Sequence, residues 1–94
     1  MRQIEKDMLA AIAANVVEWK QANTRVHQVV GRVEVQLHGH TIARHDGHAW
    51  EFNLCGWNTP TTRSRINALG ANVSSKAGKP HVLGRPVPDD GWFA

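Results

Sequence analysis

The feature that most constrains the fold is a run of alternating apolar and polar residues, which two glycine-containing turns divide into short segments. In residues 32–38, valine and leucine occupy every second position, so a strand there has one apolar face and one polar face. The dipeptides Gly39-His40 and Asp46-Gly47 have the composition of two-residue hairpin turns. The pattern therefore predicts an antiparallel β-meander of three or four strands in residues 24–56.

A long helix is predicted before the meander, in residues 3–22. Apolar residues recur along it at intervals of four and three, at Ile4, Met8, Ile12, Val16 and Trp19. This spacing places them on one stripe of a helix. We expect the stripe to cover the apolar face of the sheet, and a stripe that binds a partner is the alternative.

A second, short helix is predicted in residues 57–70. Thr59 is a suitable N-cap, Pro60 suits the first helical position and Gly70 can end the helix in the left-handed conformation. Arg63 and Arg65 are expected on the outer flanks of this helix, where reversing their charge would leave the core intact.

These elements predict an α+β fold, with a long N-terminal helix packed on an antiparallel three- to five-stranded sheet and a short second helix after the meander. We expect the apolar pair Trp92-Phe93 to dock on the core, with docking on a partner as the alternative. The expected organisation is a single domain, 1–94, made of a helix (1–23), a β-meander (24–56), a helix (57–70), a β-hairpin (71–84) and an irregular tail (85–94).

Composition limits the function classes. The 94 residues carry a net charge of +3 and one cysteine, Cys55, so neither a disulfide framework nor a cysteine zinc site can form. No apolar run approaches the roughly 20 residues of a membrane span, and no secretory leader is evident. We expect a protein of the host cytoplasm with no membrane partner. The excess of positive charge falls in residues 24–85, which favours an acidic partner or a nucleic acid.

Four of the six histidines lie near the two hairpin turns, at His38, His40, His45 and His48. The two turns lie at opposite ends of one strand, roughly 15 Å apart, so the four side chains cannot meet on one metal ion. Solvated histidines are expected, and a weak two-histidine site stays open as the alternative. No metal or cofactor is predicted. No nucleophilic or paired-carboxylate pattern stands out, so the protein is not expected to be an enzyme.

Three motifs carry a resemblance to known proteins. NTRV (23–26), LHGHTIAR (37–44) and GWNTPTTRSRINAL (56–69) resemble an NTxV…LHGN…CGW…TTxxRLNAL pattern of small accessory proteins of tailed bacteriophages. His40 stands where that pattern has asparagine, and Ile66 stands where it has leucine. The resemblance covers roughly residues 23–70 and implies a phage accessory protein. Some phage proteins of this size inhibit host defence, anti-CRISPR proteins among them.

We therefore expect a non-enzymatic phage accessory protein that binds and inhibits a host protein or ribonucleoprotein, with a defence complex as the leading target. The alternative is a small nucleic-acid-binding protein that uses a basic arginine surface. A monomer and a homodimer are both compatible with the sequence. The predicted partner-binding residues are Arg63, Arg65, Thr61, Arg32, Arg44 and Trp57.

Overall fold

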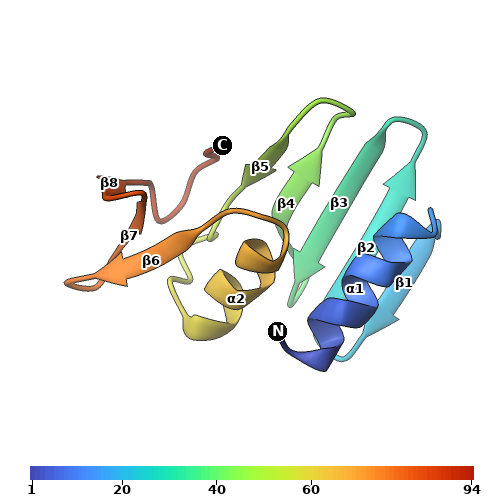
Figure 1. Cartoon of the computed structure of the whole chain (residues 1–94), viewed down its shortest axis with the longest axis horizontal. Coiled ribbons are helices and arrows are strands. Elements are labelled where there is room, and N and C mark those ends of the chain that lie inside the picture. Colours follow the sequence, from blue (N-terminus) through green and yellow to red (C-terminus); the bar gives the residue numbers. More distant parts are fainter.

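The computed structural model describes residues 1–94 and is built on a five-stranded antiparallel sheet in the order β1-β2-β3-β4-β5 (Figure 1). Strands that follow one another in the chain are neighbours in the sheet, so the predicted antiparallel meander is confirmed. The strands are β1 (Glu18–Gln21), β2 (Thr24–Val29), β3 (Arg32–Leu37), β4 (His40–His45) and β5 (Trp50–Phe52).

The first helix, α1, spans Gln3–Ala13, so the prediction of a long helix over residues 3–22 is wrong. Asn15 adopts a left-handed φ of 55°, which ends the helical path. The chain then turns into β1, where Trp19 lies opposite Val26 of β2. The consecutive β-branched pair Val16-Val17 favours extended backbone over helix. The helical spacing of apolar residues continues beyond Ala13, so this spacing did not show where the helix ends.

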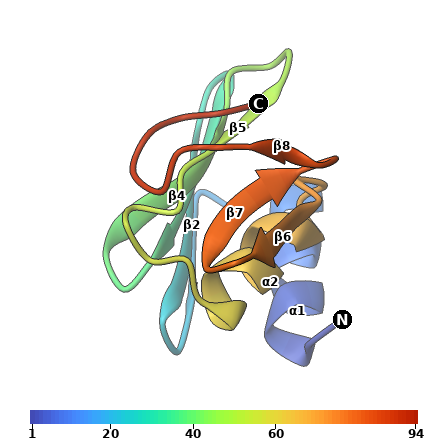
Figure 2. The same ribbon diagram turned by 90° about the vertical axis from the view of Figure 1, so that its left-hand side faces the viewer.

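Both helices lie on the same face of the five-stranded sheet, and the other face has no helix over it (Figure 2). The core fills the space between these layers. A bulge in β4 contributes to it: Val35 pairs with Ala43 and Gln36 with Thr41, so Ile42 is the extra residue, and both Ile42 and Ala43 are buried. The core residues are Met8, Val26, Val35, Leu37, Ile42, Ala43, Phe52, Leu54, Ile66, Ala71 and Val73.

The hairpin turns differ slightly from the prediction. The β3–β4 turn is formed by His38 and Gly39, both with positive φ, one residue earlier than expected. Before β5, the Asp46 carboxylate accepts hydrogen bonds from the His48 and Ala49 amides. This four-residue loop replaces the predicted two-residue turn and delays the start of β5.

The second helix, α2, spans Pro60–Ala68 and begins as predicted. The Thr59 hydroxyl accepts a hydrogen bond from the Thr62 amide, and Pro60 occupies the first turn. Gly70 has a φ of 101°, as expected for a residue that ends a helix. The strands β6 (Val73–Lys76), β7 (Lys79–Val82) and β8 (Arg85–Pro86) then form a second, three-stranded antiparallel sheet, so the predicted hairpin gains a third strand.

The tail docks on the core, as predicted. Phe93 and Phe52 exchange two backbone hydrogen bonds of 2.7 and 2.9 Å, and their ring centroids are 6.1 Å apart. The Gly56 amide also donates to the Asp89 carbonyl. The tail thereby adds one antiparallel bridge to the free edge of β5.

A buried ion pair connects the two helices. Arg65 and Glu5 are 4% and 2% exposed, and Arg65 Nη1 lies 2.8 Å from Glu5 Oε2. Arg65 Nε also donates to the Thr24 hydroxyl of β2, and Ser64 donates to the same carboxylate. The expectation that Arg65 lies on an outer flank is therefore wrong. It follows Thr62 by three positions, which places it on the inner face of the helix.

We predict that Arg65→Met lowers the free energy of unfolding by about 3–5 kcal/mol, because it leaves the Glu5 carboxylate buried without its partner. Arg63→Met is the matched control. Arg63 is half-buried and bonds to Asn58 alone, so we expect a loss of about 1 kcal/mol or less. Urea denaturation measures both values. Equal losses in the two variants would contradict this role for the buried pair.

We also predict that acid weakens the fold through Glu5. Burial raises the pKa of this carboxyl, but hydrogen bonds from Ser64, the Arg2 amide and Arg65 outweigh burial and hold the pKa below 4.5. The resulting stability is present above pH 4.5 and is lost as the pH falls through the lower, folded-state pKa. The free energy of unfolding of Glu5→Gln should therefore fall less between neutral and acidic pH than that of the unchanged protein. Parallel pH profiles of the two proteins would exclude Glu5 as a source of the acid sensitivity.

Candidate functional site

One hollow of the molecule is a cavity of about 510 Å³. It lies at the end of the sheet where the β1–β2 and β3–β4 turns meet the start of α2. Its buried lining comes from the apolar side chains of Leu37, Ile42 and Leu54 and from Thr62, whereas its exposed lining includes Trp57. The full lining is Asn23, Leu37, His38, His40, Ile42, Leu54, Cys55, Trp57, Thr59, Thr61 and Thr62.

Trp57 is the most distinctive side chain of this cavity, because it is 60% exposed. Its backbone is held on both sides: the Trp57 amide donates to the Leu54 carbonyl at 2.9 Å, and the Thr59 amide donates to the Trp57 carbonyl at 2.8 Å. The indole is thus presented from a fixed loop between β5 and α2. Such an aromatic side chain can bind a partner at a small cost in conformational entropy.

The start of α2 offers few free backbone donors to an anion. The Thr62 amide is bound by the Thr59 hydroxyl, the Arg63 amide donates to the Thr59 carbonyl, and Pro60 has no amide hydrogen. Most donors of the first turn are therefore used within the helix.

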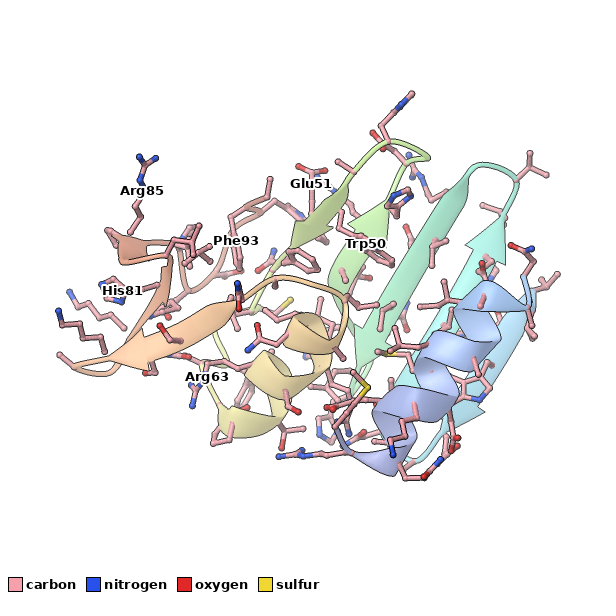
Figure 3. The ribbon with its side chains drawn as sticks, viewed as in Figure 1. Trp50, Glu51, Arg63, His81, Arg85 and Phe93 are labelled. Carbon is pink, nitrogen blue, oxygen red and sulfur yellow. The ribbon has the colours of Figure 1, made fainter.

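The predicted arginine surface is also divided. Arg65 is buried, and the Arg44 guanidinium pairs with Glu51 at 3.0 Å and lies 3.8 Å from the centre of the Trp92 ring. Arg63, labelled in Figure 3, donates to the Asn58 carbonyl and side chain. These arginines are engaged within the chain and do not form one continuous cationic face.

The remaining predicted residues fall at two ends of the sheet. Thr61 and Trp57 line the cavity together. Arg32 is exposed at the opposite end, where it lines an open hollow with Val29 and Val30. Of the six predicted partner-binding residues, the structure therefore brings only Thr61 and Trp57 into one site.

Sequence reasoning missed His38, His40 and the buried apolar lining as parts of this site. The alternating direction of the strands in the meander was enough to predict where these histidines lie. Each antiparallel strand reverses direction, so the end of β5 must return to the same side as the β3–β4 turn. The helix that follows β5 therefore has to begin beside those two histidines.

The histidines do not assemble into a metal centre. His38 and His40 lie at the cavity, whereas His45 lies at the opposite end of the sheet, where its ring is 5.1 Å from that of Trp50. No group of three or more His, Cys, Asp or Glu side chains is placed to hold a metal ion.

Cys55 lines the cavity but is poorly suited to nucleophilic attack. Its Sγ donates to the Thr41 carbonyl at 3.3 Å. Burial, and then the nearby Asp90 carboxylate, raise the pKa of the thiol. The protonated thiol therefore dominates at neutral pH, and the thiolate is the reactive form.

The chain is a small α+β phage protein. It belongs to the family described as Kyanoviridae Gp96 protein, whose model matches residues 1–86. The match includes both helices and both sheets and ends before the segment that docks on β5. No curated protein and no solved structure matches the chain. Neither helix has the length and apolar character needed to cross a membrane.

We predict that Cys55 reacts more slowly with iodoacetamide at neutral pH in the folded protein than in urea, because folding buries the thiol and raises its pKa. Mass spectrometry of the alkylated chain over time measures both rates. The variant Asp90→Asn removes the nearby negative charge and should accelerate the reaction in the folded state. A folded protein that reacts faster than the unfolded chain would point to an activated cysteine instead.

Proposed function

We propose that this phage protein acts without catalysis, by binding and inhibiting a host protein, and that the target is part of a host defence complex. The observation that carries the proposal is Trp57, a tryptophan 60% exposed beside a cavity with a buried apolar lining. Tryptophan is among the residues that contribute most to protein–protein binding energy.

The polarity of the cavity supports a protein ligand. The lining formed by Leu37, Ile42 and Leu54 suits an apolar side chain of a partner. The polar groups of His38, His40 and Thr61 surround it, in keeping with the apolar centre and polar rim of protein interfaces.

The lack of a suitable nucleophile supports a non-enzymatic role. Cys55 is the one thiol in the cavity, and its raised pKa keeps it protonated. His38 and His40 have exposed side chains, and no carboxylate lines the cavity to orient them. Binding is therefore the activity that this set of side chains supports.

Membership of a phage family supports a target in the host cell. The choice of a defence complex rests on the resemblance to small phage accessory proteins, some of which inhibit host defence. A nucleic-acid partner has less support, because Arg25, Arg44 and Arg65 are paired with acidic side chains of the same chain. A continuous basic surface is the usual requirement for binding a phosphate backbone.

We predict that Trp57→Ala weakens partner binding by about 2 kcal/mol, or roughly 30-fold in dissociation constant. The experiment captures proteins from nuclease-treated host lysate on immobilised protein and compares the variants quantitatively. Leu83→Ala is the matched control, because Leu83 is 84% exposed and lies outside the cavity. Both variants should keep the thermal stability of the unchanged protein, since each removes an exposed side chain.

The proposal requires a host protein that the unchanged protein and Leu83→Ala retain and that Trp57→Ala loses. Equal retention by all three proteins would place the interface elsewhere. If no host protein is retained, and free DNA or RNA binds with an affinity that falls steeply with salt, the nucleic-acid alternative replaces this one.

A further inference from the structure

The two edges of the five-stranded sheet differ in what pairs with them. At β5, the backbone of Phe52 is bridged by Phe93 of the tail through two hydrogen bonds. At the other edge, β1 pairs with β2 alone, and no element lies beyond it (Figure 1). An open edge carries unpaired backbone donors and acceptors that can add another strand.

The register identifies which backbone groups are free. The Gln28 amide donates to the Val17 carbonyl, so residue 17 directs its backbone polar groups toward β2. In an antiparallel strand this direction alternates, so the backbone groups of Glu18 and Lys20 point away from the sheet. The free edge therefore offers the amide and carbonyl of Glu18 and those of Lys20, with Trp19 between them.

The side chains of β1 also divide between two faces. Glu18 and Lys20 are exposed on the face without helices, opposite His27 and Arg25 respectively. Glu18 binds Arg25 at 2.8 Å, whereas Lys20 has no acidic partner and faces the cationic Arg25. Trp19 lies on the helix face, half-buried against the core.

We propose that two copies of this chain pair antiparallel through the free edge of β1, with Glu18 of each copy opposite Lys20 of the other. The two-fold axis of this dimer then passes between Trp19 of one copy and Trp19 of the other. Each Glu18–Lys20 pair consists of residues whose backbone groups face the partner, so each pair exchanges both of its backbone hydrogen bonds. The same register that completes the backbone bonds also places opposite charges together.

Charge complementarity identifies a second copy as the partner. Across the open face, strand pairing aligns Glu18, His27, Glu34, Arg44 and Glu51 in one row. Lys20 of the second copy adds a cation next to Glu18. In the neighbouring row, Glu18 of the second copy supplies the acid that Lys20 lacks. Opposite charges in directly paired positions stabilise a sheet.

On the side of the sheet that carries the helices, the residues of the β1 edge offer apolar contact. Val17 is 63% exposed, although it lies beside the half-buried Trp19 on the same side of β1. Pairing about Trp19 brings the two tryptophans together, with one Val17 on either side. This surface is distinct from the cavity around Trp57, so dimer formation and host-protein binding can be tested separately.

The test is the mass of the protein in solution, measured by sedimentation over a range of concentrations. We expect the unchanged protein to have twice the mass of one chain at about 100 µM or above. Lys20→Glu places two acids opposite each other at both pairs and should raise the dissociation constant at least about tenfold. Lys76→Glu makes the same change of charge in β6, away from β1, and should leave the dimer intact.

Two further variants separate edge pairing from a folding defect. Lys20→Pro removes an amide that points away from β2, a position that tolerates proline in an edge strand. It should yield a folded monomer with an unchanged circular dichroism spectrum. Glu18→Lys alone should also be monomeric, but mixing it with Lys20→Glu should restore a dimer, because opposite charges then meet at both pairs. A monomeric unchanged protein, or a dimer that survives both Lys20→Glu and Lys20→Pro, would overturn the proposal.

Discussion

The ion pair between Glu5 and Arg65 is the interaction on which the arrangement of the two helices depends. It joins the first turn of α1 to α2, and through Thr24 it reaches β2 of the sheet. These contacts link residues 60 and 41 positions apart in the chain. In a domain of 94 residues with a small core, one such buried network sets how the helices lie on the sheet.

The helix that takes part in this network also forms part of the candidate site. Thr62 and Arg65 are buried on the same side of α2, so the face of the helix that binds Glu5 also closes one wall of the cavity. The loop that carries Trp57 is then fixed between the end of β5 and the capped start of α2. The exposed indole is positioned by hydrogen bonds of the backbone on both sides of it.

Local patterns predicted the parts of the fold that depend on local physics. The alternation in β3, the capping residues of α2 and the apolar character of Trp92-Phe93 each led to a structure that the protein adopts. The turn at Asn15 was missed, because the apolar spacing of α1 continues into a segment that pairs as a strand. Periodicity measures which residues can share a face and does not detect the end of a helix.

The candidate site was harder to predict because it depends on contacts distant in sequence. Arg65 looked like a surface residue because its partner, Glu5, is 60 positions away. Arg44 was predicted to bind a partner, although it contacts Glu51 across the β4–β5 hairpin and Trp92 of the tail. Thr61 and Trp57, by contrast, line one cavity and come from one short segment. Long-range pairing decides which charged groups remain available at a surface.

The bridge between Phe93 and Phe52 has a consequence for the growth of assemblies. A sheet with two open edges can add copies at both ends, which leads to filaments without a defined length. Here Phe93 of the tail already bridges β5 at Phe52, so β1 is the more open edge, and the proposed two-fold pair uses that edge up. On that proposal, the segment 87–94, which lies outside the family match, disfavours strand addition at β5 and with it the growth of filaments.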